Sequence, residues 1–375
     1  TIETTYRAEW NTYANARSTQ GGLADAQYYL AAMSLKASQD KSNGAMIAGM
    51  GTPWGETNGD SNPVGYHLIW PRDLFKFANA LITAGDTATA NKTVNYLFNV
   101  QMQTSDCGTA EYNAAGCAQG FSRVGRFPQN SWMSGFQYWQ GTQLDQQGMP
   151  IILAERLGRN DLWPKIRQAA DYLAATGPYT FQERWEEQAG YSPSTIAAEV
   201  AGLVAAAKIA RANSDLVRAK NYLAKADLWQ QKVAEWTFTN TGSLGDGNYY
   251  IRISKNTNPN DGGTIDDKNG GGVRDERRVV DGGFLELVRL GVKDANDGGV
   301  LATIPEYDAT LKQTITGKGP AWFRYNFDGY GEKNDGSNYD GSGRGRLWPI
   351  FTAERGMYEI AKAGNVGSMG NSYLT

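Results

Sequence analysis

Three glutamates crowd into one five-residue stretch, residues 183–187 (Glu-Arg-Trp-Glu-Glu). A Gly-Tyr-Ser-Pro turn follows it, and an apolar run begins at Ile196. A carboxyl group beside another carboxylate and an indole ring tends to keep its proton, because its charged form is disfavoured. A proton kept near neutral pH is what a general acid needs in order to protonate a leaving oxygen. The alternative is a solvated acidic face at the end of a loop, and the spacing alone favours neither interpretation.

Three further segments combine aromatic rings with charged and amide side chains, namely residues 66–73 (Tyr-His-Leu-Ile-Trp-Pro-Arg-Asp), 131–145 and 322–332. In the first, Trp70 can stack on the C–H face of a sugar ring, while Arg72 donates and Asp73 accepts hydrogen bonds of hydroxyl groups. Each segment also has a structural interpretation when it is taken alone. These are an ion pair at a helix start, a core tryptophan and a packed aromatic loop, respectively.

Composition removes several other kinds of chemistry. The net charge of the 375 residues is -3, so no basic surface indicates a nucleic-acid partner. No uninterrupted apolar stretch is long enough to predict a membrane span, since the run 195–210 carries Glu199 and Lys208. The single histidine, His67, leaves no histidine-rich zinc site, and no Gly-x-Ser-x-Gly elbow accompanies it. Carboxylates, hydroxyls, Arg and Lys must therefore do the chemistry, and we expect no required cofactor.

Two cysteines and one acidic loop bear on the compartment and on metal binding. Cys107 and Cys117 lie in a loop rich in small residues, which predicts a short-range disulfide and a secreted or periplasmic protein, although two free thiols stay open. The loop 257–269 contains Asp261, Asp266 and Asp267, which could hold calcium. No known calcium-loop spacing matches, so a solvated loop is favoured.

The elements that must position these residues are mostly helices. Apolar residues recur at helical spacing over ten segments, which are 23–37, 72–84, 88–102, 143–157, 161–175, 195–212, 215–236, 280–290, 307–315 and 347–363. Asp161 and Asp215 are expected N-caps, and residues 249–253 are expected to form a short strand. Long loops rich in Gly and aromatics separate many of the helices. Consecutive helix pairs with such loops at one end suggest a barrel of helical hairpins.

Taken together and in their order along the chain, the acidic segment and the three aromatic segments resemble glycoside hydrolase family 15, the glucoamylase and glucodextranase family. The resemblance is closest to the bacterial members of this family. The resemblance runs from residue 66 to Pro349 and implies that residues 1–375 are one catalytic domain. It also implies an all-α, (α/α)6 barrel. The activity that it implies is an inverting release of β-D-glucose from non-reducing ends of α-glucans, through α-1,4 or α-1,6 bonds.

Roles for individual residues follow from the resemblance in the same way. Glu186 corresponds to the general acid. The residues that correspond to its supporting neighbours or to sugar-binding positions are Tyr66, Trp70, Arg72, Asp73, Trp139, Glu183, Trp185, Glu187 and Arg324.

An inverting hydrolase also needs a general base roughly 6.5–9.5 Å from the acid. The family carries this base in a Pro-Glu-Gln-type loop before its last helix, and no such segment occurs before Thr375. Glu354 is a weaker candidate, because it lies in the amphipathic segment 347–363. Six hairpins need twelve helices and ten are predicted, so we expect the base and the last two helices to lie beyond Thr375, in a C-terminal fragment.

The beginning of the chain resembles only the segment that links the barrel to the N-terminal β-sandwich of bacterial relatives. We therefore expect that β-sandwich to be absent from this chain. The main alternative function is a carbohydrate-binding remnant without turnover, and a trehalase or phosphorylase on a related barrel is a weaker one.

Overall fold

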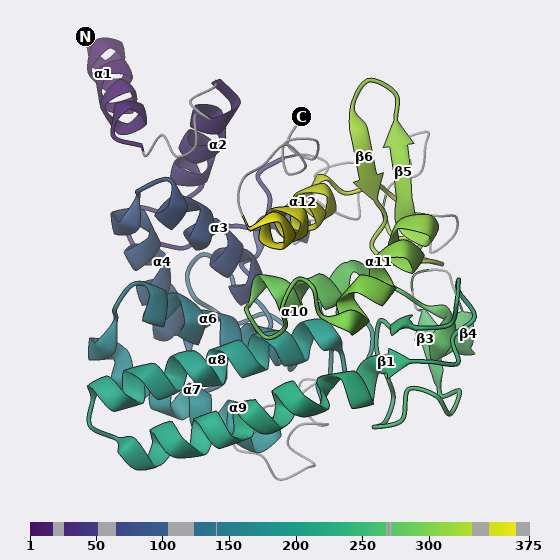
Figure 1. The fold of residues 1–375 in the computed structure, drawn as a ribbon. Coiled ribbons are helices and arrows are strands. Elements are labelled where there is room, and N and C mark those ends of the chain that lie inside the picture. Colours follow the sequence, from purple (N-terminus) through teal and green to yellow (C-terminus); the bar gives the residue numbers. More distant parts are fainter. Residues whose placement is uncertain are drawn as a thin grey trace.

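The computed structural model describes residues 1–17, 26–51, 65–103, 124–139, 141–267, 269, 272–331 and 345–364. Within these ranges the chain forms eleven α-helices and three small two-stranded sheets (Figure 1). The α-helices are α1 (Ile2–Asn15), α2 (Ala26–Ala37), α3 (Pro71–Thr83), α4 (Thr87–Val100), α6 (Asp145–Arg156), α7 (Trp163–Thr176), α8 (Pro193–Ala212), α9 (Leu216–Thr237), α10 (Leu285–Arg289), α11 (Gly298–Leu311) and α12 (Pro349–Ala363). Single 3-10 turns are η2 (Gly65–His67), η3 (Asn160–Leu162), η4 (Glu276–Arg278) and η5 (Gly282–Phe284).

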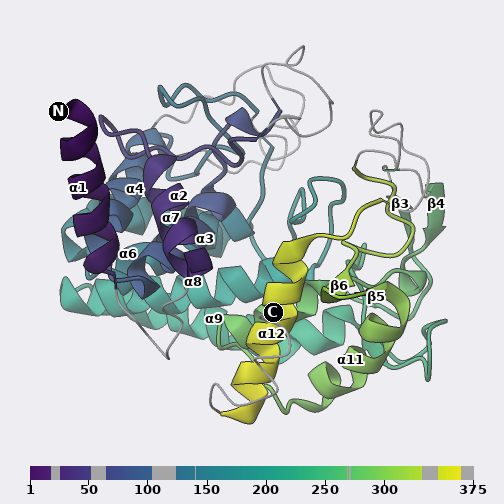
Figure 2. The ribbon, with the colours of Figure 1, turned by 90° about the horizontal axis from the view of Figure 1, so that it is seen from above.

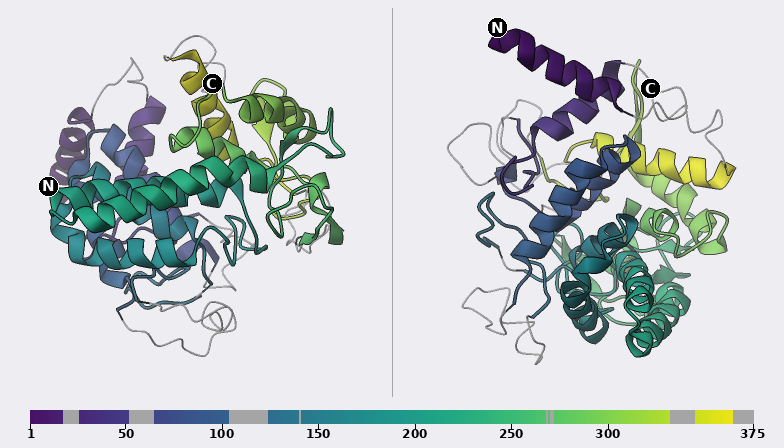
Figure 3. Two further views of the ribbon diagram at one scale, coloured as in Figure 1. Left: turned by 60° about the horizontal axis from the view of Figure 1, so that its bottom comes forward. Right: turned by 90° about the vertical axis from the view of Figure 1, so that its left-hand side faces the viewer.

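The helices lie in two layers. Helices α3 and α4, α6 and α7, and α8 and α9 pack as consecutive hairpins, and α8 and α9 run side by side in Figure 1. The inner members also pack on one another in the order α3, α6, α8, α10, α12. An ion pair between Lys76 on α3 and Glu354 on α12 joins the two ends of this series. Helix α1 packs on α2 and lies at one edge of the molecule in Figure 2 and in the right panel of Figure 3.

Helix α8 forms the centre of the core. Most of its residues are buried, and it packs against α6, α7, α9 and α10. A Cβ atom on Gly148 of α6 would lie 2.2 Å from the carbonyl oxygen of Ala198, so only glycine allows this close approach of α6 and α8. By length and apolar composition α8 could cross a membrane, but 83% of its most apolar window is buried inside the protein, as in the core helix of a globular domain.

Three antiparallel hairpins lie beside the helices. The pairs are β1 (Phe238–Thr239) with β2 (Tyr249–Tyr250), β3 (Thr264–Asp267) with β4 (Gly272–Asp275), and β5 (Lys312–Ile315) with β6 (Gly319–Trp322). In the first pair, Phe238 faces Tyr250 and Thr239 faces Tyr249. Of the short strand predicted at 249–253, only residues 249–250 form a strand, which is β2, and residues 251–253 lie outside it.

The predicted N-caps have different outcomes. Asp215 is confirmed, since its carboxylate accepts a hydrogen bond from the Arg218 amide at 3.1 Å. The prediction that Asp161 caps a helix is wrong, because residues 160–162 form a 3-10 turn and α7 begins at Trp163, just before Pro164. Asp161 instead accepts hydrogen bonds from the side chain of Arg159.

Two helix predictions also need correction. Residues 307–315 do not form one helix, because α11 ends at Leu311 and residues 312–315 form β5. Glycines with left-handed backbone at 317 and 319 turn the chain there into the β5–β6 hairpin. The segment 280–290 holds only η5 and the short α10. Apart from these two, the first ten residues, which resemble a linking segment in the sequence, mostly belong to helix α1, and this helix has no buried residue.

Candidate active site

A cavity of about 590 Å³ lies at one end of the inner helices. Its lining includes residues from the first turns of α3, α6, α8, α10 and α12, together with the loops 182–187 and 324–330. The inner helices therefore present their N-terminal ends to the cavity. Such ends carry partial positive charge, which stabilises carboxylates placed there.

A tight turn in residues 183–187 carries Glu186 into this lining. The Glu186 amide donates to the carbonyl of Glu183 at 2.8 Å, and the Glu183 amide donates to the carbonyl of Gln188 at 2.8 Å. Glu186 has a φ of 67°, a left-handed conformation that is costly for a residue with a Cβ atom. Strain of this kind in a cavity wall is typical of functional positions.

Two neutral donors bind one oxygen of Glu186. The indole Nε1 of Trp70 donates to Glu186 Oε1 at 2.7 Å, and Gln143 Nε2 donates to the same oxygen at 2.8 Å. The side-chain amide oxygen of Gln143, Oε1, accepts hydrogen bonds from the side chains of Arg72 and Gln146. Because a guanidinium can only donate, this contact fixes the amide orientation and turns the Gln143 nitrogen toward Glu186.

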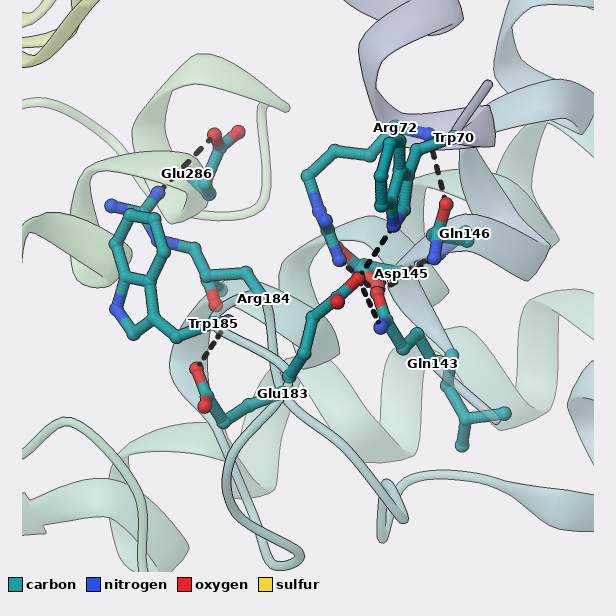
Figure 4. A network of polar contacts seen from close by, with 12 residues as sticks. Trp70, Arg72, Gln143, Asp145, Gln146, Glu183, Arg184, Trp185 and Glu286 are labelled. Atoms are coloured by element: carbon teal, nitrogen blue, oxygen red, sulfur yellow. Dashed lines mark hydrogen bonds and ion pairs between the residues drawn. The ribbon is translucent and has the colours of Figure 1, made fainter. Parts of the chain in front are cut away.

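Arg72 is held by α6. Its Nε donates to Asp145 Oδ2 at 2.7 Å, so its salt bridge is with Asp145 rather than with its neighbour Asp73. Figure 4 shows Trp70, Arg72, Gln143 and Asp145 together on one side of the site. Asp73 also lines the cavity, and burial raises its pKa despite the nearby charges of Arg72 and Lys76.

The other two glutamates of the turn face a buried arginine. Arg252 Nη2 lies 2.8 Å from Glu183 Oε1 and 2.8 Å from Glu187 Oε2. Burial raises the pKa of Glu183, while for Glu187 the charges of Arg252 and Arg324 outweigh burial and lower the pKa. The crowding that the sequence suggested is thus relieved by a cation from a distant segment. Glu187 lines the cavity, whereas Glu183 does not.

A second charged cluster lies beside Glu354. Lys76 Nζ donates to Glu354 Oε1 at 2.6 Å, and Arg184 Nη1 donates to Oε2 at 3.3 Å. Burial alone would raise the pKa of Glu354, but Lys76, Arg184 and Arg289 lower it to about 2. Glu354 is 5% exposed and is not part of the cavity lining. A carboxylate held so firmly as an anion is a poor proton acceptor, which argues against Glu354 as the base.

Aromatic rings make up much of the remaining wall. The hydroxyls of Tyr66 and Tyr330 lie 2.6 Å apart, and the rings of Trp70 and Trp139 meet edge to face at 6.1 Å. Trp139 is 41% exposed, so part of its face is open to a ligand. Flat apolar faces beside hydroxyls and charged groups suit a sugar ring.

Trp185 and Arg324 lie on the other side of the cavity. The Trp185 indole donates to Asp281 Oδ2 at 2.9 Å, and the guanidinium carbon of Arg324 lies 5.2 Å from the Trp185 ring centroid. Arg324 is also fixed by two hydrogen bonds of 2.7 Å to Asp328. Figure 4 places Arg184 beside Glu286, with Trp185 next to Arg184, across from the Arg72 side.

The comparison with known proteins agrees with this arrangement. The model of the family described as Glycosyl hydrolases family 15 matches residues 23–374. The chain belongs to this family. This confirms the resemblance found in the sequence.

Two family 15 relatives are similar over nearly the whole of this chain. It is 48% identical over 362 residues to a glucoamylase from Clostridium sp. (strain G0005), which covers 96% of this chain and 49% of the relative. It is also similar to the crystal structure of a bacterial glucoamylase complexed with acarbose, with a TM-score of 0.88, 47% identity, and coverage of 99% and 52% of the two chains. This family 15 chain thus spans about half the length of both relatives.

A more distant relative shows the fold alone. The glucoamylase from Saccharomycopsis fibuligera matches 90% of this chain and 73% of its own with a TM-score of 0.54 at 16% identity. Together with the bacterial glucoamylase, it places this family 15 chain in the all-α, (α/α)6-barrel class. The predicted fold class is therefore confirmed.

The structure brings most of the predicted site residues of the family 15 chain together. Those that line this cavity are Tyr66, Trp70, Arg72, Asp73, Trp139, Trp185, Glu186, Glu187 and Arg324. Glu183 begins the turn but lies outside the cavity lining, and its Oε2 accepts a hydrogen bond from the Trp185 amide at 2.9 Å. This position fits a supporting role and not contact with a substrate.

Sequence reasoning missed several partners of these residues. Arg252 holds Glu183 and Glu187, and it comes from none of the four segments. Gln143 and Asp145 lie within the segment 131–145, but their contacts with Glu186 and Arg72 were not predicted, and neither was the contact of Lys76 with Glu354. Arg252 had a signal in the sequence, since a lone charge inside the apolar run 249–253 needs a buried partner. Lys76 and Asp145 lie on helices α3 and α6, where polar residues are common, and Gln143 lies just before α6.

The remaining predictions concern the cysteines and calcium. Cys107 and Cys117 lie outside the described residues, so their pairing stays a prediction. In the part of the chain that the structure describes, no three His, Cys, Asp or Glu side chains group as metal ligands. Asp267 pairs with Arg252 at 3.1 Å and with Arg274 at 2.5 Å, and burial raises its pKa to about 6.

Proposed function

We propose that this chain is the catalytic barrel of an exo-acting, inverting glycoside hydrolase that releases β-D-glucose from non-reducing ends of α-glucans. Membership of family 15, the identity to a glucoamylase, and the similarity to a bacterial glucoamylase complexed with acarbose support the substrate class. A cavity with aromatic walls and a carboxyl group at a strained turn supports the reaction class.

The arrangement of hydrogen bonds at Glu186 carries the proposal. Trp70 and Gln143 both donate to Oε1, so this oxygen acts only as an acceptor. A proton on Glu186 must then reside on Oε2. A fixed carboxyl group with its proton on a defined oxygen is what protonation of a glycosidic oxygen requires.

In the reaction, Glu186 protonates the oxygen of the bond that breaks, while Arg72, Asp73 and the rings of Tyr66 and Trp70 hold the terminal glucose. A base on the opposite face of the sugar activates water. Among the described residues, three carboxylates of the lining form salt bridges with arginines, namely Asp145, Glu187 and Glu286. Each of these three carboxylates is thus already paired with an arginine, and none of them is assigned as the base.

Hydrolysis of maltotriose and of isomaltotriose tests the proposal and the linkage together. We expect glucose release, with the β-anomer formed first as observed by NMR, and loss of release in Glu186→Gln. Release of the α-anomer first would contradict inversion. Release that survives in Glu186→Gln would contradict the role of Glu186.

A carbohydrate-binding protein without turnover is the second candidate, and the salt bridges of the lining carboxylates favour it. Calorimetric titration with the same two trisaccharides separates it from an enzyme. Binding with no glucose released by the full chain would support this second function.

A further inference from the structure

We propose that Arg252 is a positioning residue that clamps both ends of the turn 183–187 and thereby aims Glu186 into the cavity. The inference rests on the proposed role of Glu186 as the general acid. It concerns a buried side chain that lies outside the four aromatic and acidic segments and is not part of the cavity lining.

The first step is the construction of the turn. Glu183 and Glu187 flank its apex, and Glu186 stands at the apex with a left-handed backbone. The Glu183 carboxylate accepts from the amides of Trp185, at 2.9 Å, and Glu187, at 3.4 Å. A strained apex keeps its conformation only when its surroundings fix both flanks.

The second step is that one guanidinium nitrogen contacts both flanks. Arg252 Nη2 lies 2.8 Å from Glu183 Oε1 and 2.8 Å from Glu187 Oε2. Arg324 also approaches Glu187, at 3.3 Å, but no contact of 4.0 Å or less joins it to Glu183 within the described residues. The clamp of the two flanks is therefore assigned to Arg252.

The third step is that Arg252 itself is rigidly held. Its side chain is fully buried, and Nη1 donates to Asp267 Oδ1 at 3.1 Å. Its guanidinium carbon lies 3.8 Å from the ring centroid of Tyr325, whose hydroxyl donates to Glu187 Oε2 at 2.6 Å. The backbone amide of Arg252 donates to the carbonyl of Val279 at 2.9 Å.

The backbone around Arg252 also joins the loop directly. Ser254 and Tyr191 exchange two backbone hydrogen bonds, of 2.8 and 2.9 Å, just after the turn. The segment 251–254 is thus a fixed support from which Arg252 reaches the carboxylates. Lysine could keep the positive charge there, but it lacks the planar fork that meets three carboxylates at once.

The test compares two substrates in Arg252→Lys. A glycosidic oxygen needs protonation as it leaves, whereas the fluoride of α-glucosyl fluoride leaves with little help from an acid. We expect kcat on maltotriose to fall about 30- to 100-fold, as for a displaced catalytic group, and kcat on α-glucosyl fluoride to stay within about threefold. Equal losses on both substrates, or no loss, would overturn the inference.

Two variants control for general damage. Arg274→Gln removes another arginine that pairs with Asp267, and we expect it to keep activity on both substrates. If Arg252→Lys does not fold, the double variant Arg252→Met with Glu183→Gln removes one charge of each sign and should show the same selective loss. An unselective loss in that double variant would also refute the positioning role.

A crystal structure of Arg252→Lys separates this inference from the proposed function. We expect Glu186 Oε1 to leave hydrogen-bond distance of Trp70 Nε1 and Gln143 Nε2. Unchanged geometry would overturn the inference whatever the activity. Failure of the wild-type chain to release glucose would refute the proposed function, while this structure would still decide the role of Arg252.

Discussion

Glu186 and Glu354 lie beside the same cavity, and their surroundings differ in the kind of donor that each carboxylate meets. Glu186 stands at a strained turn and accepts hydrogen bonds from an indole and an amide, both on one oxygen. Glu354 lies on α12, and its two oxygens meet the charged groups of Lys76 and Arg184. One side chain is held by neutral donors and the other by cations.

The difference shows how a fold gives two identical side chains separate tasks. Neutral donors fix the position of Glu186 and leave one oxygen available for a proton. Cations hold Glu354 as an anion, with a pKa lowered to about 2 by Lys76, Arg184 and Arg289 against the effect of burial. We therefore expect substitution of Glu186 to affect chemistry, and substitution of Glu354 to affect stability.

The largest effect is expected from Glu186→Gln. The amide keeps the size of the side chain but carries no proton that can be transferred. We expect kcat on maltotriose to fall about a thousandfold, within the range for loss of a general acid. The measured melting temperature should change little, since glutamine can still accept from Trp70 and Gln143.

The matching change at the other region is Glu354→Gln. It leaves Lys76 without its counter-charge and removes one of the three carboxylates that lie within 3.8 Å of Arg184, and breaking a buried pair in this way costs about 3–5 kcal/mol. Urea denaturation measures this loss in the free energy of unfolding. Glu235→Gln, on an exposed pair with Lys232, is the control and should cost less than about 0.5 kcal/mol.

Kinetics of the same Glu354→Gln variant could break the comparison. If it kept its stability and lost as much activity as Glu186→Gln, then Glu354 would act in the reaction and not in the scaffold.

The dependence of stability on pH sharpens the role of Glu354. Its pKa is lowered in the folded state, so its stabilising contribution is complete above the ordinary glutamate pKa and is lost as pH falls toward about 2. We expect the gap in melting temperature between wild type and Glu354→Gln to narrow steadily from pH 5 to pH 2. A constant gap over this window would contradict the lowered pKa.

The sequence predicts the residues that line the cavity better than the buried residues that hold them in place. Trp70, Asp73 and Glu186 could be assigned because their motifs are local and place the functional groups within a few residues. The role of Arg252 could not be assigned from the sequence, because it depends on contacts with Glu187 and Glu183, which lie 65 and 69 positions away in the chain. No local pattern reports which buried carboxylate a distant arginine will meet.

Among the helices, too, some follow from a local sequence pattern and others do not. Regular apolar spacing predicts α3, where Leu74, Phe75, Ala78 and Leu81 form the buried face. The start of α11 escapes prediction, because two glycines follow its capping Asp297 and a proline stands inside the helix. Such a helix is stabilised by tertiary contacts and by a single cap, and not by the intrinsic helix propensity of its residues.

Glu199 on α8 adds a third environment to the comparison, a buried carboxyl group for which the described residues provide no salt bridge and no hydrogen-bond donor. It is fully buried, and neither oxygen has a hydrogen-bond partner among the described residues. Burial raises its pKa well above the ordinary value, and Asp145 adds to this. A carboxyl group with a raised folded-state pKa loses stabilising effect as pH rises through that value.

The variant Glu199→Gln removes this titration. We expect its melting temperature minus that of wild type to increase between pH 5 and pH 8, whatever its offset at pH 5. A difference that stays flat, or falls, would mean that Glu199 is ionised inside the folded protein.

The smallest effect is expected from Trp70→Phe, which removes one of the two donors to Glu186. A hydrogen bond of this kind contributes about 1–1.5 kcal/mol, so we expect kcat on maltotriose to fall about tenfold. Loss of the indole also reduces the aromatic wall, and the double variant with Glu186→Gln separates the two causes. If Trp70 acts through Glu186, its substitution costs little more once Glu186 is already glutamine. If the two losses simply multiply, Trp70 contributes as a wall for the sugar, and Gln143 alone holds the carboxyl group of Glu186.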